Sequence, residues 1–263
     1  MDRTRLAGRV VAITGGGSGI GRGAALRCAD EGAQVAVLDV RAALAEAVAE
    51  EIRTAGGEAL AIECDVADEA SVEAAVTRTV EHFGSLWGMV ANAGTASRGW
   101  IHETALADWH FVMNVNLTGA FLCAKHAIPH MLAGGGGSFV GTASIAGSVI
   151  GPGGANASYA VSKAGLMQLA RQIAVDYGPQ GIRANTIQPA AVEGSNLGRH
   201  ASEDRQRQST PNAELPRPRG WQPIARAGRP YEDYGAAIAF LLSDDAAFIT
   251  GSALPVEGGF LST

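Results

Sequence analysis

The chain contains 263 residues, of which 47% are hydrophobic and 17% are charged. This composition can bury a large core and is unlike that of a disordered chain. The 20 basic and 26 acidic residues leave a net charge of −6, which argues against general nucleic-acid binding, because that needs clustered positive charge. We therefore expect a globular protein that does not bind nucleic acid.

Cysteines, histidines and apolar runs argue against several other classes. The three cysteines are scattered without C-x-x-C spacing, which predicts buried thiols rather than a disulfide framework or a zinc site. His126 and His130 have the spacing of a metal half-site, but position 127 is alanine where H-E-x-x-H has glutamate, so we expect no metal. The N-terminus is short and polar, and no apolar run approaches the roughly 18 residues of a membrane span. These features predict a soluble cytoplasmic protein with no membrane partner.

Short runs of strand-forming residues alternate with amphipathic segments. The expected strands are Val10–Thr14, Gln34–Asp39, Ala59–Cys64, Leu86–Ala91, Ser138–Thr142, Ile182–Gln188 and Ser252–Val256. One helix opens at a glycine turn after the first strand, and the others are Arg41–Ala55, Glu69–His82, Leu106–Leu132, Tyr159–Tyr177 and Tyr231–Leu242. This alternation predicts βαβ units around a parallel sheet covered on both faces. No linker or repeat divides the chain, so we expect a single α/β domain spanning residues 1–263.

Residues 194–230 break the alternation. This polar segment contains seven arginines against three acidic residues. Segments this long without strand or helix patterns are usually lids or binding loops, or else disordered. Two interpretations stay open. The segment is either a lid whose arginines favour an anionic substrate or cofactor phosphates, or a solvated loop.

A glycine-rich turn follows the first expected strand. Residues 14–21 read T-G-G-G-S-G-I-G and lead into a helix. Glycines permit a tight turn and a close approach of backbone N–H groups to a pyrophosphate, and the helix N-terminus adds unpaired donors and a positive dipole end. The spacing is G-x-x-x-G-x-G rather than G-x-G-x-x-G, so an ordinary glycine turn is the alternative.

Asp39 ends the second expected strand, 18 residues after Gly21. A carboxylate at this place can accept hydrogen bonds from both hydroxyls of an adenosine ribose and would repel a 2′-phosphate. The residue therefore favours NAD over NADP, although the nearby Arg41 could soften that preference. A solvent-exposed aspartate at a strand end is the alternative interpretation.

Tyr159 and Lys163 lie four residues apart at the start of an expected helix, so both face the same side. An ammonium near a phenol favours the phenolate and lowers the tyrosine pKa from about 10. A tyrosine tuned in this way can exchange a proton with an alcohol or ketone. Ser144 comes just after the strand Ser138–Thr142, where open α/β sheets place their ligands. Its hydroxyl could hold a substrate oxygen.

Together these motifs resemble the short-chain dehydrogenase/reductase family, and the resemblance covers nearly the whole chain. The turn at residues 14–21 resembles the family's cofactor motif. Asp65 matches the aspartate near the adenine, and Asn92-Ala93-Gly94 matches the stretch after the fourth strand. Asn116 matches the family's structural and proton-relay asparagine. Ser144, Tyr159 and Lys163 match its catalytic serine, tyrosine and lysine.

The resemblance implies a doubly wound sheet of seven strands in the order 3-2-1-4-5-6-7. It also implies hydride transfer at the nicotinamide ring, with Tyr159 as acid/base and Ser144 orienting the substrate oxygen. Lys163 would hold the nicotinamide ribose and connect through water to Asn116. The expected cofactor-binding residues are Gly15, Gly17, Ser18, Gly19, Ile20, Gly21, Asp39, Asp65, Val66, Asn92, Ala93, Gly94, Tyr159, Lys163, Pro189 and Val192.

The sequence departs from the family pattern after the sixth strand. Pro189-Ala190 stands where Pro-Gly is common, and Gly194 stands where threonine is usual. These changes alter the positions that, by the resemblance, hold the carboxamide and pyrophosphate on that side. Val192 could still act through its backbone, because that contact needs no side chain.

The sequence predicts an NAD-dependent enzyme that interconverts a secondary alcohol and its ketone. One rival is an NADPH-dependent reductase of β-ketoacyl thioesters, against which Asp39 argues. A rival of another class is a nucleotide-binding scaffold or sensor without turnover, against which the complete set of reacting groups argues. An epimerase or dehydratase is a weaker third reading, because the chain shows no second substrate domain. By resemblance, we expect self-association as a homotetramer or dimer.

Overall fold

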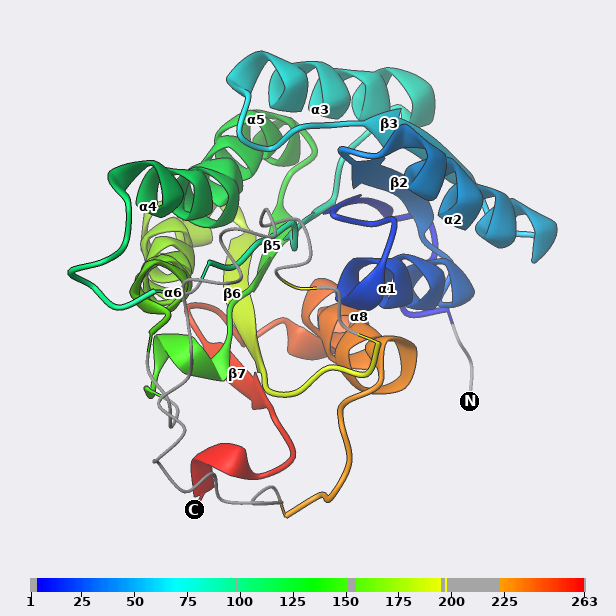
Figure 1. The fold of residues 1–263 in the computed structure, drawn as a ribbon. Helices are drawn as coiled ribbons and strands as arrows, with labels where there is room; N and C mark the ends of the chain where they lie inside the picture. The colour runs from blue at the N-terminus through cyan, green and yellow to red at the C-terminus, as the bar shows by residue number, and fades with distance from the viewer. Residues whose placement is uncertain (1–3, 98, 151–154, 195–196, 198–222, 263) are drawn as a thin grey trace.

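A computed structural model describes residues 4–97, 99–150, 155–194, 197 and 223–262. Seven parallel strands form one sheet in the order β3-β2-β1-β4-β5-β6-β7 (Figure 1). This order confirms the predicted doubly wound topology. The strands are β1 (Val10–Thr14), β2 (Gln34–Asp39), β3 (Ala59–Glu63), β4 (Gly88–Ala91), β5 (Gly137–Thr142), β6 (Ile182–Pro189) and β7 (Ala253–Val256).

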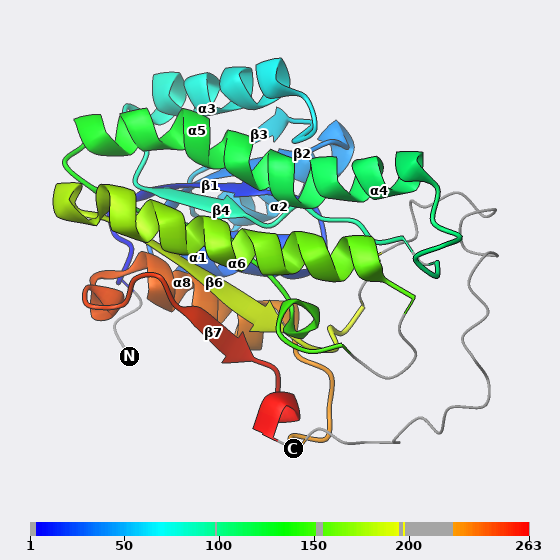
Figure 2. The same cartoon turned by 90° about the vertical axis from the view of Figure 1, so that its left-hand side faces the viewer.

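Helices cover both faces of the sheet (Figure 2). They are α1 (Gly19–Asp30), α2 (Ala42–Thr54), α3 (Glu69–Phe83), α4 (Leu106–Met113), α5 (Gly119–Ala133), α6 (Ala157–Tyr177) and α8 (Ala236–Leu242). Short π-helices precede two of them, η1 (Asn114–Thr118) before α5 and η4 (Pro230–Gly235) before α8. Single 3-10 turns are η2 (Ile145–Gly147), η3 (Gly178–Gln180), η5 (Asp244–Ala246) and η6 (Phe260–Ser262).

Two hydrophobic cores lie on opposite sides of the sheet. Side chains of a strand alternate between its faces. Val10 and Ala12 of β1 accordingly pack in the core that also contains α3, α5 and α6. Val11 and Ile13 pack in the core that contains α1, α2 and α8. Burial on both faces explains why the strands read as continuous apolar runs.

The expected strand boundaries agree with the structure to within two residues. The stretch expected as one helix over Leu106–Leu132 differs, because α4 passes through the π-helix η1 before α5. The Gly119 N–H bonds to the carbonyl of Asn114, five residues earlier. Such a single extra residue leaves the apolar pattern nearly unchanged, and pattern alone therefore does not reveal it.

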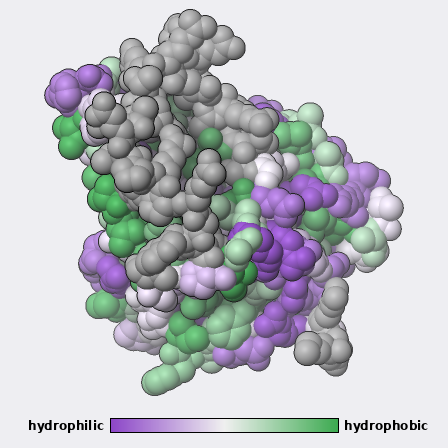
Figure 3. Space-filling view, turned by 60° about the horizontal axis from the view of Figure 1, so that its bottom comes forward, coloured by the Kyte–Doolittle hydropathy of each residue, from purple (hydrophilic) through white to green (hydrophobic). Residues whose placement is uncertain are grey.

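Apolar side chains also lie on the surface. Val149, Ile150, Ile224 and Phe248 are exposed, and the face in Figure 3 shows hydrophobic residues interspersed with hydrophilic ones. Single exposed apolar residues are normal and need no functional explanation. Among the described residues, none of the helices is both long and apolar enough to cross a membrane.

Candidate active site

The turn between β1 and α1 forms an open cradle. Gly15 and Gly19 have φ of +61° and +52°, in the left-handed region that glycine adopts without strain. A methyl group on Gly21 would lie 2.1 Å from the Gly15 carbonyl oxygen, whereas one on Gly19 would meet nothing within 4 Å. Ser18 is the N-cap of α1, and its side chain caps none of the first N–H groups. This cradle fits the pyrophosphate of a dinucleotide.

Asp39 presents a buried carboxylate beside the cradle. Its side chain is 4% exposed. Oδ2 accepts a hydrogen bond from the Gly17 N–H at 3.0 Å, and Oδ1 accepts one from the Arg41 N–H at 3.0 Å. The Arg41 guanidinium lies 3.5 Å from Oδ1 and 3.4 Å from the Ser18 hydroxyl. The negative charge is therefore fixed next to the turn, with one basic group in contact.

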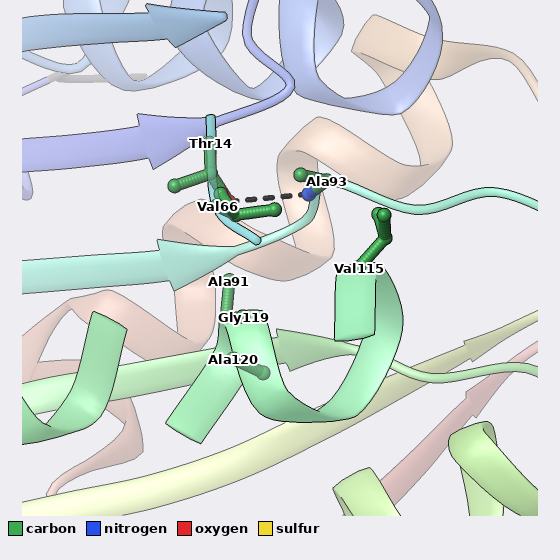
Figure 4. A pocket seen from close by; sticks show the side chains of 7 residues that line it. All are labelled: Thr14, Val66, Ala91, Ala93, Val115, Gly119 and Ala120. Atoms are coloured by element: carbon green, nitrogen blue, oxygen red, sulfur yellow. Dashed lines mark hydrogen bonds between the residues drawn. The ribbon is translucent and has the colours of Figure 1, made fainter. Parts of the chain in front are cut away.

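Hydrogen bonds join the carboxyl ends of β1, β4 and β5 next to the glycine turn. The Thr14 hydroxyl accepts the N–H groups of Asn92 and Ala93 at 3.0 and 3.1 Å. Figure 4 shows the bond to Ala93. The Asn92 amide donates to the Thr14 carbonyl at 2.9 Å and accepts from the Thr142 hydroxyl at 3.1 Å. A small pocket lies here, lined by Thr14, Val66, Ala91, Ala93, Val115, Gly119 and Ala120. The roles of Thr14 and Thr142 could not be predicted from the sequence, because hydroxyls at strand ends give no distinctive signal.

Asp65 and Val66 lie on the loop after β3, next to this pocket. The Asp65 N–H donates to the Ser71 hydroxyl at 3.0 Å, and its carboxylate accepts the Ala67 N–H at 2.9 Å. Val66 is buried against Gly119, where an added methyl group would come within 2.9 Å of it. The loop that contains Asp65 and Val66, which is predicted to lie near the adenine, thus packs through Val66 against the start of α5.

Ser144 follows β5 and is the N-cap of the turn η2. Its side chain oxygen accepts the Ala146 N–H at 3.1 Å. That bond uses the oxygen as an acceptor, so the hydroxyl proton remains to be donated. The Ser144 side chain also interacts with that of Tyr159, and this interaction opposes the rise in the pKa of the phenol.

Tyr159 and Lys163 lie on the first turns of α6, as predicted. The Lys163 ammonium donates to the Thr142 carbonyl at 2.7 Å and lies 5.7 Å from the centre of the Tyr159 ring. Burial lowers the pKa of Lys163 to about 8. Burial also raises the pKa of Tyr159, although its interaction with Ser144 lowers it in part.

The expected lowering of the Tyr159 pKa by Lys163 is therefore wrong for this structure. The ammonium faces the carbonyl at the end of β5, and removal of the phenol from water disfavours its charged form. Spacing along a helix predicts that two side chains share a face, but it does not predict the desolvation of either.

Asn116 lies in η1 with 1% of its surface exposed. Its amide oxygen accepts the Thr95 N–H at 2.8 Å, and its amide nitrogen donates to the Thr95 carbonyl and the Ser162 hydroxyl at 2.9 and 3.0 Å. A methyl group on Gly94 would lie 3.3 Å from the Lys163 ammonium and 3.4 Å from the Asn116 amide oxygen. The structure thus brings Asn116 and Lys163 together at Gly94.

Comparison with known proteins decides the family. A family model described as enoyl-(acyl carrier protein) reductase matches residues 15–261. The chain is 40% identical to 2-(S)-hydroxypropyl-CoM dehydrogenase 3 of Xanthobacter autotrophicus over 255 residues, 97% of each chain. It is 42% identical to cis-4-hydroxycyclohexanecarboxylate dehydrogenase of Sinomonas cyclohexanicum over 254 residues, 96% of each chain.

The chain belongs to the short-chain dehydrogenase/reductase family. A solved structure of 7α-hydroxysteroid dehydrogenase, complexed with NADH and 7-oxo glycochenodeoxycholic acid, has the same fold with a TM-score of 0.84 and 32% identity. That match covers 98% of this chain and 96% of the other. Members of this family are nicotinamide-dependent oxidoreductases, and the sequence-based recognition is confirmed.

The last predicted cofactor residues of this dehydrogenase lie at the end of the sixth strand and just after it. Pro189 ends β6, and Val192 forms a parallel bridge with Gly228. The Gly228 N–H donates to the Ala191 carbonyl at 2.9 Å, which also accepts from the Tyr234 hydroxyl at 3.0 Å. The backbone at Val192 is therefore held in place although the family's usual residues nearby are replaced.

Two arginines at the end of the segment 194–230 are paired within the chain. Arg226 makes two hydrogen bonds to the Asp233 carboxylate, and that hydrogen bonding lowers the pKa of Asp233 to about 2. The Arg229 guanidinium lies 3.5 Å from the Glu232 carboxylate. The backbone N–H of Arg229 donates to the Asp233 carboxylate at 2.7 Å. Both side chains thus have acidic partners of their own. The other five arginines of the segment fall outside the described residues.

The cysteines are buried, as the sequence predicted. Burial raises the pKa values of all three thiols, that of Cys64 to about 11. A thiol needs its thiolate form to act as a nucleophile. The cysteines are therefore held in the neutral thiol form, which is a poor nucleophile.

Proposed function

We propose that this protein is an NAD-dependent dehydrogenase that interconverts a secondary alcohol and its ketone, with Tyr159 as the acid/base. The observation that carries the proposal is the meeting of Ser144, Tyr159 and Lys163 at the carboxyl ends of β5 and the start of α6. In open α/β sheets, ligands bind at this end of the strands. The relatives named as dehydrogenases of hydroxyl-bearing substrates support the same reaction class.

The substrate oxygen is held and protonated or deprotonated by this chain's own groups. The Ser144 oxygen accepts the Ala146 N–H, and its hydroxyl proton is available to donate a hydrogen bond to the substrate oxygen. During oxidation, Tyr159 accepts the hydroxyl proton while the carbinol C–H bond breaks. During reduction, Tyr159 returns a proton to the ketone oxygen. A bound nicotinamide cofactor supplies or accepts the hydride.

Lys163 and Asn116 support the acid/base step. The Lys163 ammonium is buried and fixed by the Thr142 carbonyl, where it can hold a ribose hydroxyl. A methyl group added to Gly94 would lie 3.3 Å from the Lys163 ammonium and 3.4 Å from the Asn116 amide oxygen, so a water between these two groups could carry protons away from Tyr159. We therefore assign Lys163 to ribose binding and both residues to proton relay.

Asp39 supports NAD as the preferred cofactor. The carboxylate is buried and fixed beside the glycine turn, where it would accept the ribose hydroxyls and oppose a 2′-phosphate. The remaining cofactor contacts are proposed for the predicted residues of the glycine turn, for Asp65 and Val66, for Asn92 to Gly94, and for Pro189 and Val192.

A panel of cyclic, aliphatic, steroid and hydroxyacyl secondary alcohols, each tested with NAD and with NADP, tests the proposal. We expect NAD reduction with at least one class. Activity confined to NADPH and β-ketoacyl thioesters would favour the reductase reading instead. Binding of NAD without turnover of any substrate would favour the scaffold reading.

Three further expectations stay predictions. They are a single domain with residues 194–230 covering the substrate, self-association as a homotetramer or dimer, and a cytoplasmic location. Residues 195–196 and 198–222 of the proposed cover lie outside the described part of the chain.

A further inference from the structure

Gln188 is a buried polar residue that the mechanism above does not use. It is the second-last residue of β6, and only 3% of its surface is exposed. Its backbone pairs with Pro255 of β7 in the sheet. A buried amide needs hydrogen-bond partners, because burial without them is costly. The partners that it has indicate what the side chain does.

The Gln188 amide joins three elements. Its Nε2 donates to the Ser148 hydroxyl at 2.6 Å and lies 2.8 Å from the sulfur of Met167. Ser148 directly follows the turn η2 as its C-cap, and Met167 belongs to α6. One side chain from β6 therefore contacts both the turn after Ser144 and the helix that carries Tyr159.

This turn is held at its two ends by β6. At its start, the Ala143 N–H donates to the Ile187 carbonyl at 2.9 Å. At its end, Gln188 holds Ser148. Between them, Gly147 lies against α6 so closely that an added methyl group would come within 2.9 Å of the Lys163 carbonyl carbon. The position of Ser144 relative to Tyr159 thus depends on how the turn is held.

We propose that Gln188 is a positioning residue that fixes the turn carrying Ser144 through its hydrogen bond to Ser148. The inference rests on the proposed function, because it gives Ser144 the task of orienting the substrate oxygen. Gln188 acts through Ser148 and the turn, and it touches neither substrate nor cofactor in this assignment. Loss of the bond would make the position of Ser144 less fixed. It would leave the glycine turn after β1 unchanged, because β4 and β5 lie between β1 and β6 in the sheet.

Ser148→Ala is the first test, because Ser148 is exposed and its replacement leaves the core intact. Gln188→Met removes the amide at similar volume, and Ser148→Thr keeps the hydroxyl as the matched control. We expect kcat/KM for the alcohol to fall about three- to tenfold in the first two variants, the range of one hydrogen bond. We expect the control to stay near wild type and the Kd for NADH to be unchanged in all three.

The double variant Gln188→Met/Ser148→Ala separates positioning from packing. If the two residues act through one bond, the double variant loses no more than the more impaired single variant. Additive losses, or wild-type kcat/KM in Ser148→Ala, would overturn the inference. So would a lowered melting temperature with unchanged kinetics in both single variants, which indicates packing alone.

Amide hydrogen exchange of residues 145–150 gives a readout that needs no substrate. We expect faster exchange of this segment in Ser148→Ala and wild-type exchange in Ser148→Thr. Failure of the proposed function would appear as a wild-type enzyme without turnover, whatever the exchange shows. Unchanged exchange in Ser148→Ala, in an active enzyme or an inactive one, would contradict the role of Gln188.

Discussion

Among single residues, desolvation is the main cause of the pKa shifts of the two groups proposed to act in the reaction. Burial raises the pKa of Tyr159 and lowers that of Lys163 to about 8. Both shifts disfavour the charged forms, as expected for groups removed from water. The identity of these residues could be predicted from the sequence, but the sign of the tyrosine shift could not, because it depends on packing from several elements.

The raised pKa of Tyr159 predicts the pH dependence of each direction of the reaction. Oxidation needs the deprotonated phenol, which is scarce below its pKa, so kcat/KM for oxidation should rise about tenfold per pH unit at neutral pH. Reduction needs the protonated phenol and should be flat or fall as the pH rises. Steady-state rates in both directions over a pH series check this. An oxidation rate that peaks at acidic pH would contradict it.

Asp39 predicts a change in cofactor preference. Asp39→Asn keeps the size of the side chain and removes the charge that opposes a 2′-phosphate. The ratio of kcat/KM for NAD to that for NADP should fall about 10- to 100-fold, as expected for one charge contact of this kind. Asp65→Asn is the matched control, because a residue near the adenine serves both cofactors and should leave the ratio unchanged. An unchanged ratio in Asp39→Asn would remove the assignment of Asp39.

At the scale of elements, a buried carboxylate ties the N-terminal segment to α1. Glu31 is 1% exposed and accepts hydrogen bonds from Arg5 at 2.6 Å and from Arg27 at 2.6 Å. Burial alone would raise the pKa of Glu31, but these two arginines together lower it below its ordinary value. The charged form is therefore the one that the folded protein stabilises.

Glu31→Gln should destabilise the protein by about 1–3 kcal/mol, the usual range for hydrogen bonds to a charged group. A carboxylate whose pKa is lowered by folding contributes stability above its unfolded pKa near 4, and that contribution is lost as the pH falls through the folded pKa. The difference between wild type and variant should thus shrink in acid. Urea unfolding at neutral and acidic pH measures it, with the exposed Glu63→Gln as control. Equal stability of wild type and Glu31→Gln at neutral pH would contradict the account.

Some elements could be predicted from the sequence and others could not. Strands such as β1 could be predicted because both faces are buried and the apolar run is continuous. The π-helix that carries Asn116 could not, since one extra residue per turn barely alters an apolar pattern. The hydroxyls of Thr14 and Thr142 join three strand ends, yet only the assembled sheet brings them to Asn92.

At the scale of the whole molecule, the sheet order brings distant segments to one edge. The cradle after β1, Asn92 after β4, Ser144 after β5 and Pro189 at the end of β6 all lie at carboxyl ends of parallel strands. Family resemblance predicted the strand order correctly. The identity of the substrate is not encoded in a motif, because it depends on the shape of the loops that surround this edge.

The proposed mechanism assigns the exchange of the substrate proton to Tyr159. Its most direct test compares kcat/KM for alcohol oxidation in Tyr159→Phe and in Tyr177→Phe, a matched tyrosine at the far end of the same helix. We predict a loss of about 10²- to 10⁴-fold in Tyr159→Phe, the range of general acid–base catalysis, with NADH binding retained and Tyr177→Phe near wild type. Wild-type turnover in Tyr159→Phe would contradict the account.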